Sequence, residues 1–274
     1  MKVWVAGRLV DEADASVSVT DHGLTVGDGV FETVKVTAAQ PFALTRHLQR
    51  LEASAGGLGL RADLAEVRTA VTAVLAAEPE LAAHGRLRIT LTGGPGPYGS
   101  DRGDAAPTLI VALAPLGGWP PTASVVTVPW RRNERSAVAG IKTTSYAENV
   151  VALAYAKARG GAEAVFANTL GNLCEGTGSN IFLVQAGRLL TPPPSSGCLA
   201  GVTRGLLLEW LDAEEADVPL AALTEADEVF LTSTTRDVQP VSLVDGRRVA
   251  PAPGPVTVKA MEVFAARAAE HVDP

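Results

Sequence analysis

The sequence predicts an α+β protein of two domains with mixed sheets, and three observations lead to this prediction. The chain has 274 residues, of which 47% are hydrophobic and 19% are charged, so it has room for two domains and can bury a core. Segments that alternate like strands are interleaved with segments of helical periodicity. A Gly- and Pro-rich stretch at 116–124, LGGWPPTAS, precedes a new strand. We therefore expect a small N-terminal α/β domain at 1–117 and a larger C-terminal mixed-sheet domain at 118–274.

In the N-terminal half, residues 2–10 predict two strands joined by a turn at Ala6-Gly7. The next strand, GVFETVKVT at 29–37, has an apolar face interrupted by Glu32 and a second face with Phe31, Thr33 and Lys35. Helical periodicity predicts one helix at 42–58, ended by two glycines, and another at 63–81. Apolar strands are expected on either side of the loop GGPGPYGSDRGD, at 85–94 and 107–116.

The C-terminal half predicts strands and helices in alternation. The expected strands are SVVTVPW, EAVFAN, NIFLV, LLT and EVFLTST, at 124–130, 163–168, 180–184, 189–191 and 228–234. The expected helices lie at 146–160, 202–212 and 256–272. This order of elements is typical of an α+β domain.

The bulk properties exclude several classes of protein. The net charge of −7 and the pI near 5.2 argue against nucleic acid as a partner, because phosphate binding requires a basic face. The apolar stretches are shorter than the roughly 20 residues of a membrane span, and the N-terminus lacks a signal-peptide pattern. Cys174 and Cys198 have no metal-like spacing and are expected as reduced thiols of a cytoplasmic protein. No metal site is expected.

Lys142 lies where a strand passes into a helix, in the stretch AGIKTTSYAENVV. Ser145 and Glu148 have the spacing of a capping box that opens the helix. The positive end of that helix and partial burial beside Ile141 disfavour the ammonium form, which favours a nucleophile or proton-transfer base. The alternative from position alone is a lysine whose head group reaches solvent from a strand end.

Three other segments carry candidate ligand groups. Glu175 lies in a Gly-rich turn before an apolar strand, with backbone donors but no cation nearby in the sequence, which suits pairing with a protonated ring nitrogen. Gly201, Val202 and Thr203 open a helix, where free amides can bind an anion. Four hydroxyl residues at 232–235 follow a strand and can hydrogen-bond to phosphate oxygens. Each has a structural alternative: a turn acid, a simple N-cap and an ordinary polar turn.

In this order, GIKTTSYAENVV, EAVFANTLGNLCEGTGSNIFLV, CLAGVTRGLLLEWL and EVFLTSTTRDVQPV resemble the fold-type IV pyridoxal-phosphate enzymes, the class IV aminotransferase family. SVTDHGLTVGDGVFETVKV and LTRHLQRLE are similar to the same family, so the resemblance covers nearly the whole chain. It implies a fold like that of the D-amino-acid aminotransferases. It also implies a homodimer that acts on a small-molecule substrate.

The resemblance further implies roles for individual residues. Lys142 would be the Schiff-base lysine of pyridoxal 5′-phosphate, and Glu175 would pair with the pyridine nitrogen. The phosphate would be bound by Arg46, Val202, Thr203 and Thr234. Phe31, Tyr98 and Thr235 are expected to line the substrate pocket, and the alternative for Phe31 is core packing. Tyr146 lies near where some members place a partner for the cofactor, Asn180 is expected to make a local structural bond, and His22 and His47 are expected to be structural.

Several runs of the sequence bear on which reaction is catalysed. The loop GGPGPYGSDRGD lacks the Arg-x-His pair of the D-amino-acid enzymes and has Arg102 as its only cation. The runs GDGVFET, AGIK and GGPGPYGS look closest to 4-amino-4-deoxychorismate lyase, which releases pyruvate and 4-aminobenzoate for folate biosynthesis. The alternatives are an aminotransferase acting on branched-chain or D-amino acids, and a non-catalytic protein that binds pyridoxal 5′-phosphate.

Overall fold

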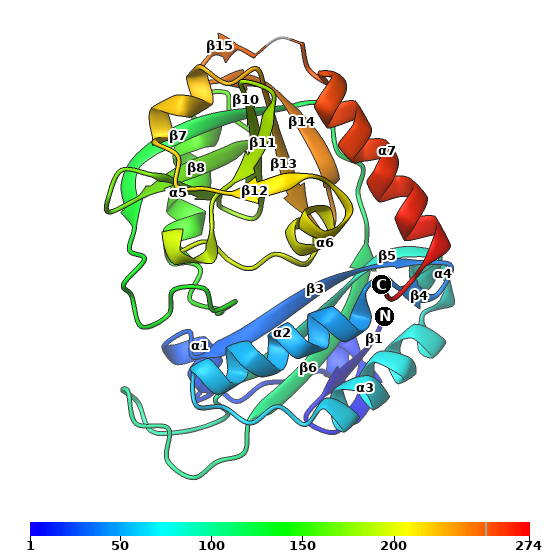
Figure 1. Ribbon diagram of the computed structural model, residues 1–274. Helices are drawn as coiled ribbons and strands as arrows, with labels where there is room; N and C mark the ends of the chain where they lie inside the picture. The colour runs from blue at the N-terminus through cyan, green and yellow to red at the C-terminus, as the bar shows by residue number, and fades with distance from the viewer. Residues whose placement is uncertain (250) are drawn as a thin grey trace. The chain divides into compact units, whose positions relative to one another are not determined.

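The computed structural model describes residues 1–249 and 251–274, and the chain divides into two compact units (Figure 1). Unit 1 comprises Met1–Gly117, Ile141–Tyr146 and Val272–Pro274, and unit 2 comprises Gly118–Gly140 and Ala147–His271. The expected domains at 1–117 and 118–274 assign Lys142 to the C-terminal part. In the structure, Lys142 groups with unit 1, because residues 141–146 are hydrogen-bonded to the strand at 29–37.

Unit 1 contains a six-stranded sheet in the order β2-β1-β6-β5-β3-β4. Its strands are β1 (Lys2–Val5), β2 (Arg8–Asp11), β3 (Gly29–Thr37), β4 (Gln40–Pro41), β5 (His84–Thr92) and β6 (Thr108–Pro115). Within the described residues all neighbouring strands of this sheet pair antiparallel, so the prediction of a mixed sheet was wrong for this unit. The reason is that successive strands, such as β5 and β6, are joined by a direct loop and not by a crossover helix.

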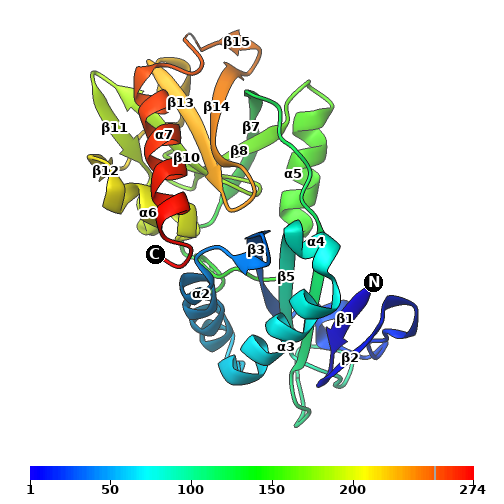
Figure 2. The same cartoon turned by 90° about the vertical axis from the view of Figure 1, so that its right-hand side faces the viewer.

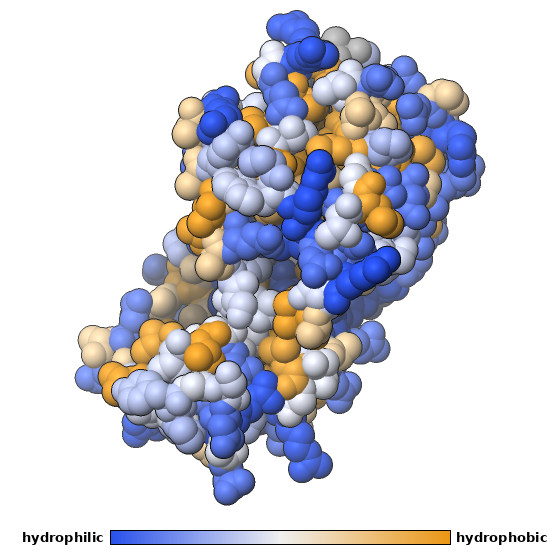
Figure 3. Space-filling view, turned by 90° about the vertical axis from the view of Figure 1, so that its left-hand side faces the viewer, coloured by the Kyte–Doolittle hydropathy of each residue, from blue (hydrophilic) through white to orange (hydrophobic). Residues whose placement is uncertain are grey.

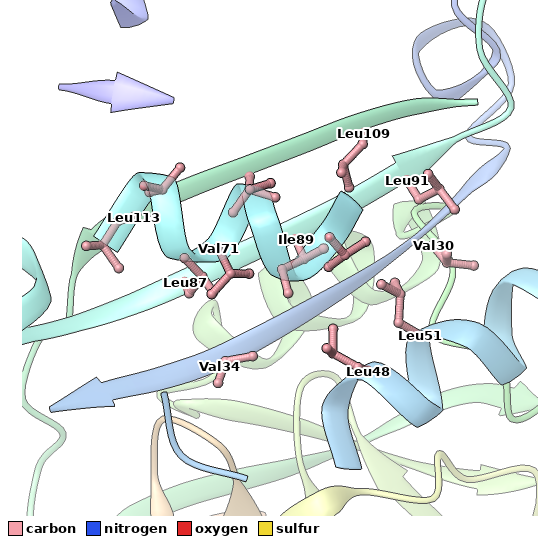
Figure 4. Close-up of a cluster of buried hydrophobic side chains, with 14 of the residues drawn as sticks. Val30, Val34, Leu48, Leu51, Val71, Leu87, Ile89, Leu91, Leu109 and Leu113 are labelled. Carbon is pink, nitrogen blue, oxygen red and sulfur yellow. The ribbon is translucent and has the colours of Figure 1, made fainter. Parts of the chain in front are cut away.

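Two helices cover one face of this sheet, α2 (Leu44–Gly57) and α3 (Leu64–Ala77) (Figure 2). Apolar side chains from both helices pack against the even-numbered residues of β3 and the odd-numbered residues of β5 and β6 (Figure 4). They include Val30, Val34, Leu48, Leu51, Val71, Leu87, Ile89, Leu91, Leu109 and Leu113. The opposite face of the sheet therefore carries Phe31, Thr33 and Lys35, as the alternation in the sequence predicts.

One expected helix of unit 1 is divided. The helix predicted at 63–81 ends at Ala77, and a short helix α4 (Pro79–Ala83) begins at a proline. Glu78, which precedes that proline, leaves the helical region with φ −126° and ψ 61°, because Pro79 disfavours the helical conformation of the residue before it. A further short helix, α1 (His22–Thr25), was not predicted; its N-cap is Asp21, whose side chain accepts a hydrogen bond from Gly23 N.

Unit 2 contains a nine-stranded sheet in the order β12-β11-β10-β13-β14-β7-β8-β9, with β15 paired to β14. Its strands are β7 (Ala123–Arg132), β8 (Glu163–Asn168), β9 (Leu173–Gly176), β10 (Asn180–Gln185), β11 (Arg188–Thr191), β12 (Ala213–Glu215), β13 (Glu228–Ser233), β14 (Asp237–Val244) and β15 (Arg247–Arg248). β7 pairs parallel with both β8 and β14, and most other pairs are antiparallel. The prediction of a mixed sheet is confirmed for this unit.

The helices of unit 2 are α5 (Ala147–Lys157), α6 (Val202–Trp210) and α7 (Pro255–Glu270). Four of its strands, β9, β12, β14 and β15, were not predicted. β9 is short and glycine-containing, and it forms because Phe166 of β8 pairs with Glu175. Within residues 1–249 and 251–274, no helix has both the length and the apolar character needed to cross a membrane.

Candidate functional site

Lys142 is held in unit 1 by backbone hydrogen bonds along the start of β3. Phe31 N donates to Lys142 O at 3.0 Å, and Thr144 N donates to Gly29 O at 2.8 Å. On the other side, Lys142 N donates to the Ser54 hydroxyl of α2 at 3.3 Å. Because β3 and α2 are both part of the unit 1 core, the backbone of Lys142 has a defined position.

The side chain of Lys142 contacts an aromatic ring. Its Nζ lies 4.5 Å from the centroid of Phe31, which is only 5% exposed. Tyr146 packs edge-on against the same ring, with centroids 5.3 Å apart, and Cζ of Arg88 lies 3.3 Å from the Phe31 centroid. Phe31 and Tyr146 therefore lie beside the lysine, and their expected roles, lining the substrate pocket and serving as a partner for the cofactor, stay predictions. Arg88 was not predicted as a site residue.

The two residues of the expected capping box make other contacts. The Ser145 hydroxyl donates to Gly27 O at 2.8 Å, as does the Thr144 hydroxyl at 2.9 Å. Glu148 forms an ion pair with Arg132. The two hydroxyl bonds to Gly27 anchor the segment after Lys142 to the turn that precedes β3.

Arg46 and Arg50, one turn apart on α2, have different surroundings. Nε of Arg46 donates to Pro274 O at 2.8 Å, so this side chain holds the C-terminus of the chain. Arg50 instead makes a two-pronged ion pair with Glu32, whose Oε1 and Oε2 accept from Nε and Nη2 at 2.8 and 2.7 Å. Arg50 is one turn before Ser54, which accepts from the backbone of Lys142.

Glu32, His47 and Arg50 form a buried charged network in unit 1. Nδ1 of His47 lies 2.7 Å from Oε2 of Glu32. Burial by itself would raise the pKa of Glu32, but the Arg50 guanidinium and the His47 ring lower this pKa to about 2. Burial lowers the pKa of His47. The signal in the sequence was an acid on the apolar face of β3 together with the His-x-x-Arg spacing in the following helix.

In unit 2, Glu175 lies on β9 and not in a turn as predicted. Its Oε2 accepts from Leu199 N at 2.9 Å, and its Oε1 lies 3.6 Å from Nε of Arg132. The local sequence offers Glu175 no cation, but β7 brings Arg132 to it from more than forty residues away. The Glu175 carboxylate therefore accepts one backbone hydrogen bond and forms an ion pair with one arginine.

The start of α6 adjoins this carboxylate. Gly201 is the N-cap and provides no side-chain cap to the amides of Val202 and Thr203. Nδ2 of Asn180 donates to Leu199 O at 2.8 Å, which is the local structural bond expected of Asn180. A Cβ placed on Gly201 would lie well inside van der Waals contact of Oδ1 of Asn180, so this position requires glycine.

The hydroxyl-rich segment at 232–235 begins beside Asn180, since Thr232 of β13 pairs with Asn180 of β10. Thr234 and Thr235 follow the strand in the turn between β13 and β14, and both are half-buried. Unit 2 thus brings together Glu175, Asn180, Val202, Thr203 and the segment of Thr234 and Thr235. The first and last of these residues, Glu175 and Thr235, are about sixty positions apart in the sequence.

The loop after β5 contains Tyr98 and Arg102. Tyr98 is 77% exposed. Arg102 makes a two-pronged ion pair with Asp28, including a 2.6 Å bond from Nη2 to Oδ1, and this hydrogen bonding raises the pKa of Arg102. His22 is 1% exposed, and its Nε2 lies 2.8 Å from Pro97 O, in agreement with the structural role expected of it. The only cation of the loop is therefore already neutralised.

Comparisons with known proteins agree along nearly the whole chain. The sequence profile of the family "Amino-transferase class IV" matches residues 29–244. A Methanocaldococcus jannaschii protein, provisionally named a branched-chain-amino-acid aminotransferase, is 34% identical over 259 residues, covering 90% of this chain and 89% of its own. D-alanine aminotransferase of Listeria innocua is 31% identical, covering 96% of this chain and 95% of its own.

Solved structures also match this chain along nearly its whole length. Branched-chain aminotransferase from Thermoproteus uzoniensis, with norvaline, has a TM-score of 0.88 at 30% identity, covering 97% of this chain and 93% of its own. A Mycobacterium tuberculosis structure, named a hypothetical aminotransferase in its PLP-bound form, has a TM-score of 0.85 at 27% identity, covering 97% and 98%. A Legionella pneumophila structure, provisionally named a 4-amino-4-deoxychorismate lyase, has a TM-score of 0.86 at 24% identity, covering 93% and 97%, and shows a shared fold alone.

Proposed function

Because this chain belongs to the class IV aminotransferase family of pyridoxal-phosphate enzymes, we propose that it transfers the amino group of an amino acid to a 2-oxo acid. The observation that supports pyridoxal-phosphate chemistry is the fixed position of Lys142, whose backbone is bonded to β3 and α2 and whose Nζ contacts Phe31. Relatives at 34% and 31% identity over nearly the whole chain are named aminotransferases, which supports this reaction.

The residues in place fit pyridoxal 5′-phosphate. Glu175 offers a carboxylate, held by Leu199 N and Arg132, for a protonated ring nitrogen. The amides of Val202 and Thr203 open a helix whose N-cap has no side-chain donor or acceptor, which is a suitable anion site. Gly201 is required at this N-cap, because a Cβ there would collide with Oδ1 of Asn180. We propose that these residues and the Thr234 hydroxyl bind the cofactor, with Lys142 as the Schiff-base residue.

For the phosphate we propose Arg50 in addition to Arg46. Arg50 lies on the part of α2 that contacts the Lys142 backbone, whereas Nε of Arg46 is bonded to the C-terminus. An Arg50→Ala variant should bind the cofactor more weakly than an Arg46→Ala variant, measured by fluorescence titration of the apoenzyme. A larger loss in Arg46→Ala would assign the phosphate to Arg46.

Each residue has a defined task in the reaction. When bound, the cofactor withdraws electrons from the carbon that carries the substrate nitrogen. Nζ of Lys142 would remove a proton from that carbon and return a proton to a neighbouring atom. Glu175 would hold positive charge on the ring nitrogen, and Phe31 would orient the lysine side chain. Phe31, Tyr98 and Thr235 are proposed to line the substrate pocket.

The lyase reaction is the second candidate. It is supported by the run GGPGPYGS after β5 and by GDGVFET, which resemble the 4-amino-4-deoxychorismate lyases. Both reactions need a lysine that moves a proton, so Lys142 and Glu175 do not distinguish them. They differ in the product: the lyase releases pyruvate and 4-aminobenzoate, and the aminotransferase forms a new amino acid.

One set of assays separates the two candidates. The purified protein would be given aminodeoxychorismate alone, and in parallel D-alanine or L-leucine with 2-oxoglutarate. Keto acid and glutamate are expected from the second mixture, while pyruvate and 4-aminobenzoate from the first would assign the lyase. The protein should be yellow and should bleach with borohydride. Lys142→Ala should lose both the colour and the turnover, whereas Lys157→Ala, on the exposed side of α5, should retain them.

We also propose that the enzyme is a homodimer in the cytoplasm. Both units expose large apolar side chains, and Figure 3 shows hydrophobic residues in orange among hydrophilic ones on one face. The exposed large apolar side chains include Val19, Leu24, Tyr98, Val150, Val151 and Leu170. Analytical ultracentrifugation should give twice the chain mass.

The proposed compartment rests on the cysteines. Cys174 and Cys198 are both free thiols, which supports a reducing compartment.

A further inference from the structure

Glu163 and Arg236 form an ion pair inside unit 2. Glu163 is the first residue of β8, and Arg236 lies in the turn between β13 and β14. Their side chains are only 2% and 6% exposed, whereas those of Glu214 and Arg188, an ion pair of the same sheet, are 50% and 59% exposed. Burial lowers the pKa of Arg236, and the charge of Glu163 opposes this shift. Because both charges lose their hydration, a buried pair adds little net stability, and what it holds in place is its more informative property.

The carboxylate of Glu163 also binds the turn that follows Glu175. Its Oε1 accepts hydrogen bonds from Gly178 N at 2.9 Å and from the Thr177 hydroxyl. Thr177 and Gly178 come directly after β9, two and three residues beyond Glu175. Glu175 itself pairs with Phe166 of β8. β8 therefore holds Glu175 through strand pairing and holds the turn after it through the Glu163 side chain.

Arg236 is fixed both by its own turn and by two neighbouring side chains. Its backbone N donates to Ser233 O at 3.2 Å and so closes the turn at 233–236. Its Nη1 donates to Oε1 of Gln239 at 2.9 Å, and its Cζ lies 3.9 Å from a ring centroid of Trp119. The guanidinium therefore has a defined place, from which it ties the turn at 233–236 to β8.

The turn at 233–236 extends beyond the strand pairing of β13 with β10. The last residue of β13 that pairs with β10 is Thr232. Thr234 comes after it, so this pairing does not by itself set the distance between the Thr234 hydroxyl and Glu175. The buried ion pair supplies a direct connection, because one of its residues belongs to this turn and the other binds the turn after Glu175.

We propose that Glu163 and Arg236 are positioning residues for the cofactor. The pair sets the distance between the Thr234 hydroxyl, at the phosphate, and the Glu175 carboxylate, at the ring nitrogen. The proposal rests on the cofactor contacts proposed above. Two contacts held at the spacing that a ligand requires bind it more tightly than the same contacts on loosely held turns, because less freedom is lost on binding. The effect of the pair should therefore be confined to a ligand that reaches both contacts.

The test breaks the ion pair without leaving a buried charge. In the double variant Glu163→Gln with Arg236→Met, the glutamine oxygen can still accept the two hydrogen bonds from the turn after Glu175. The matched control is Glu214→Gln with Arg188→Met, which removes the exposed ion pair of the same sheet.

Three probes are titrated against each apoprotein, with fluorescence or calorimetry as the measure of binding. Pyridoxal 5′-phosphate reaches both contacts, pyridoxal lacks the phosphate, and inorganic phosphate lacks the ring. The double variant should bind pyridoxal 5′-phosphate about tenfold more weakly than wild type. Its affinities for pyridoxal and for inorganic phosphate should be unchanged, and the control variant should match wild type for all three probes.

Two results would overturn the proposal. Unchanged affinity for pyridoxal 5′-phosphate in the folded double variant would mean that the pair only stabilises the unit. An equal loss for pyridoxal or for inorganic phosphate would mean that the pair acts on one contact and not on the distance between two.

A single variant serves if the double variant does not fold. Arg236→Lys keeps the charge but not the fork that reaches both Glu163 and Gln239. It should show a smaller loss, again confined to pyridoxal 5′-phosphate, and a loss shared by all three probes would contradict the spacing role. Glu175→Gln tests the contacts themselves and should weaken pyridoxal but not inorganic phosphate. Unchanged pyridoxal affinity in that variant would contradict the proposed cofactor contacts, a result distinct from any outcome of the double variant.

Discussion

Nε of Arg132 lies 3.6 Å from Oε1 of Glu175, and it is a buried donor without a hydrogen-bond partner within the described residues. The other nitrogens of this guanidinium are engaged, since they bind Glu148 and, at 2.9 Å, Oδ1 of Asn149. Nδ2 of Asn149 in turn donates to Thr177 O at 2.7 Å. Arg132 therefore lies within ion-pair distance of Glu175 and positions the turn after it through Asn149.

Replacement of Arg132 should weaken cofactor binding. An Arg132→Leu variant removes the charge that stabilises the ionised Glu175 and the hydrogen bond that orients Asn149. We expect the dissociation constant of pyridoxal 5′-phosphate to rise about tenfold, corresponding to one charged contact of about 1.4 kcal/mol. The measurement is titration of the apoenzyme followed by fluorescence.

Arg131→Leu is the matched control, because Arg131 is the exposed neighbour on the same strand and its loss should leave the affinity unchanged. Arg132→Lys should recover part of the affinity, since it restores the charge but not the fork. Equal affinities for wild type and Arg132→Leu would exclude the positioning role.

Gly201→Ala should damage both stability and cofactor affinity. The new methyl group would collide with Oδ1 of Asn180, and relief of that collision would displace Leu199, which donates to Glu175. We expect a loss of about 1–3 kcal/mol in the free energy of unfolding, as for other overpacked sites. Denaturant unfolding of the apoprotein measures this loss.

Gly205 in the same helix provides the contrast, because a Cβ there would meet no atom within 4 Å. Gly205→Ala should stabilise the protein by about 0.5–1 kcal/mol, since alanine loses less backbone freedom in a helix. If both alanine variants unfold alike, the close contact at Gly201 does not limit this site.

The Glu32 network predicts loss of stability in acid. The pKa of Glu32 is about 2 in the folded protein and lies below its ordinary value of 4.5, so the unfolded chain binds the proton first as the pH falls. The contribution of this carboxylate is complete above pH 4.5 and disappears as the pH falls to about 2. From the size of the shift it amounts to about 3 kcal/mol.

Denaturant unfolding between pH 6 and pH 2 would be compared for wild type, Glu32→Gln and Glu52→Gln, the last being an exposed acid of α2. Glu32→Gln should be less stable near neutral pH and should lose less on acidification below pH 4.5, whereas Glu52→Gln should follow wild type. The lowered pKa of His47 adds a separate loss that begins nearer pH 6.5. A Glu32→Gln curve parallel to wild type below pH 4.5 would contradict the assignment.

Cys174 and Cys198 should resist thiol reagents in the folded protein. Each is 1% exposed, and burial raises the pKa of both thiols, that of Cys198 to about 11. The thiolate is the reactive form, so labelling with a disulfide reagent should be slow in buffer and complete for both residues in denaturant. Rapid labelling of either thiol under native conditions would show that the core of unit 2 opens locally.

Much of the fold could be predicted from local pattern. The two faces of β3 and the strand pair β1 and β2 follow from alternation and turn residues, and they are confirmed. The strands β9 and β14 could not be predicted in the same way. β9 has only four residues, and β14 contains Pro240, which normally argues against a strand inside a sheet. Pairing with β8 and β13 outweighs these local preferences.

The candidate site was predictable where a single side chain in a motif carries the role, as for Lys142 and Glu175. It was not predictable where the role depends on a partner that is distant in sequence. Arg132 is forty-three positions before Glu175, and Arg88 is fifty-seven positions after Phe31, so no local spacing joins them. In the sequence both arginines are ordinary polar residues in or just after predicted strands. Only the positions of β7 and β5 in the fold bring them to Glu175 and Phe31.

The division of the chain into units has a practical consequence for expressing it in pieces. A gene cut after Gly117 would encode a fragment without residues 141–144, which supply the hydrogen-bond partners of Gly29 and Phe31. It would also lack Val272, whose carbonyl accepts from Ala43 at the start of α2. The first half of β3 would then be an open strand edge, a known cause of self-association. Shortened versions of the protein and C-terminal tags should therefore retain both short segments in their native places.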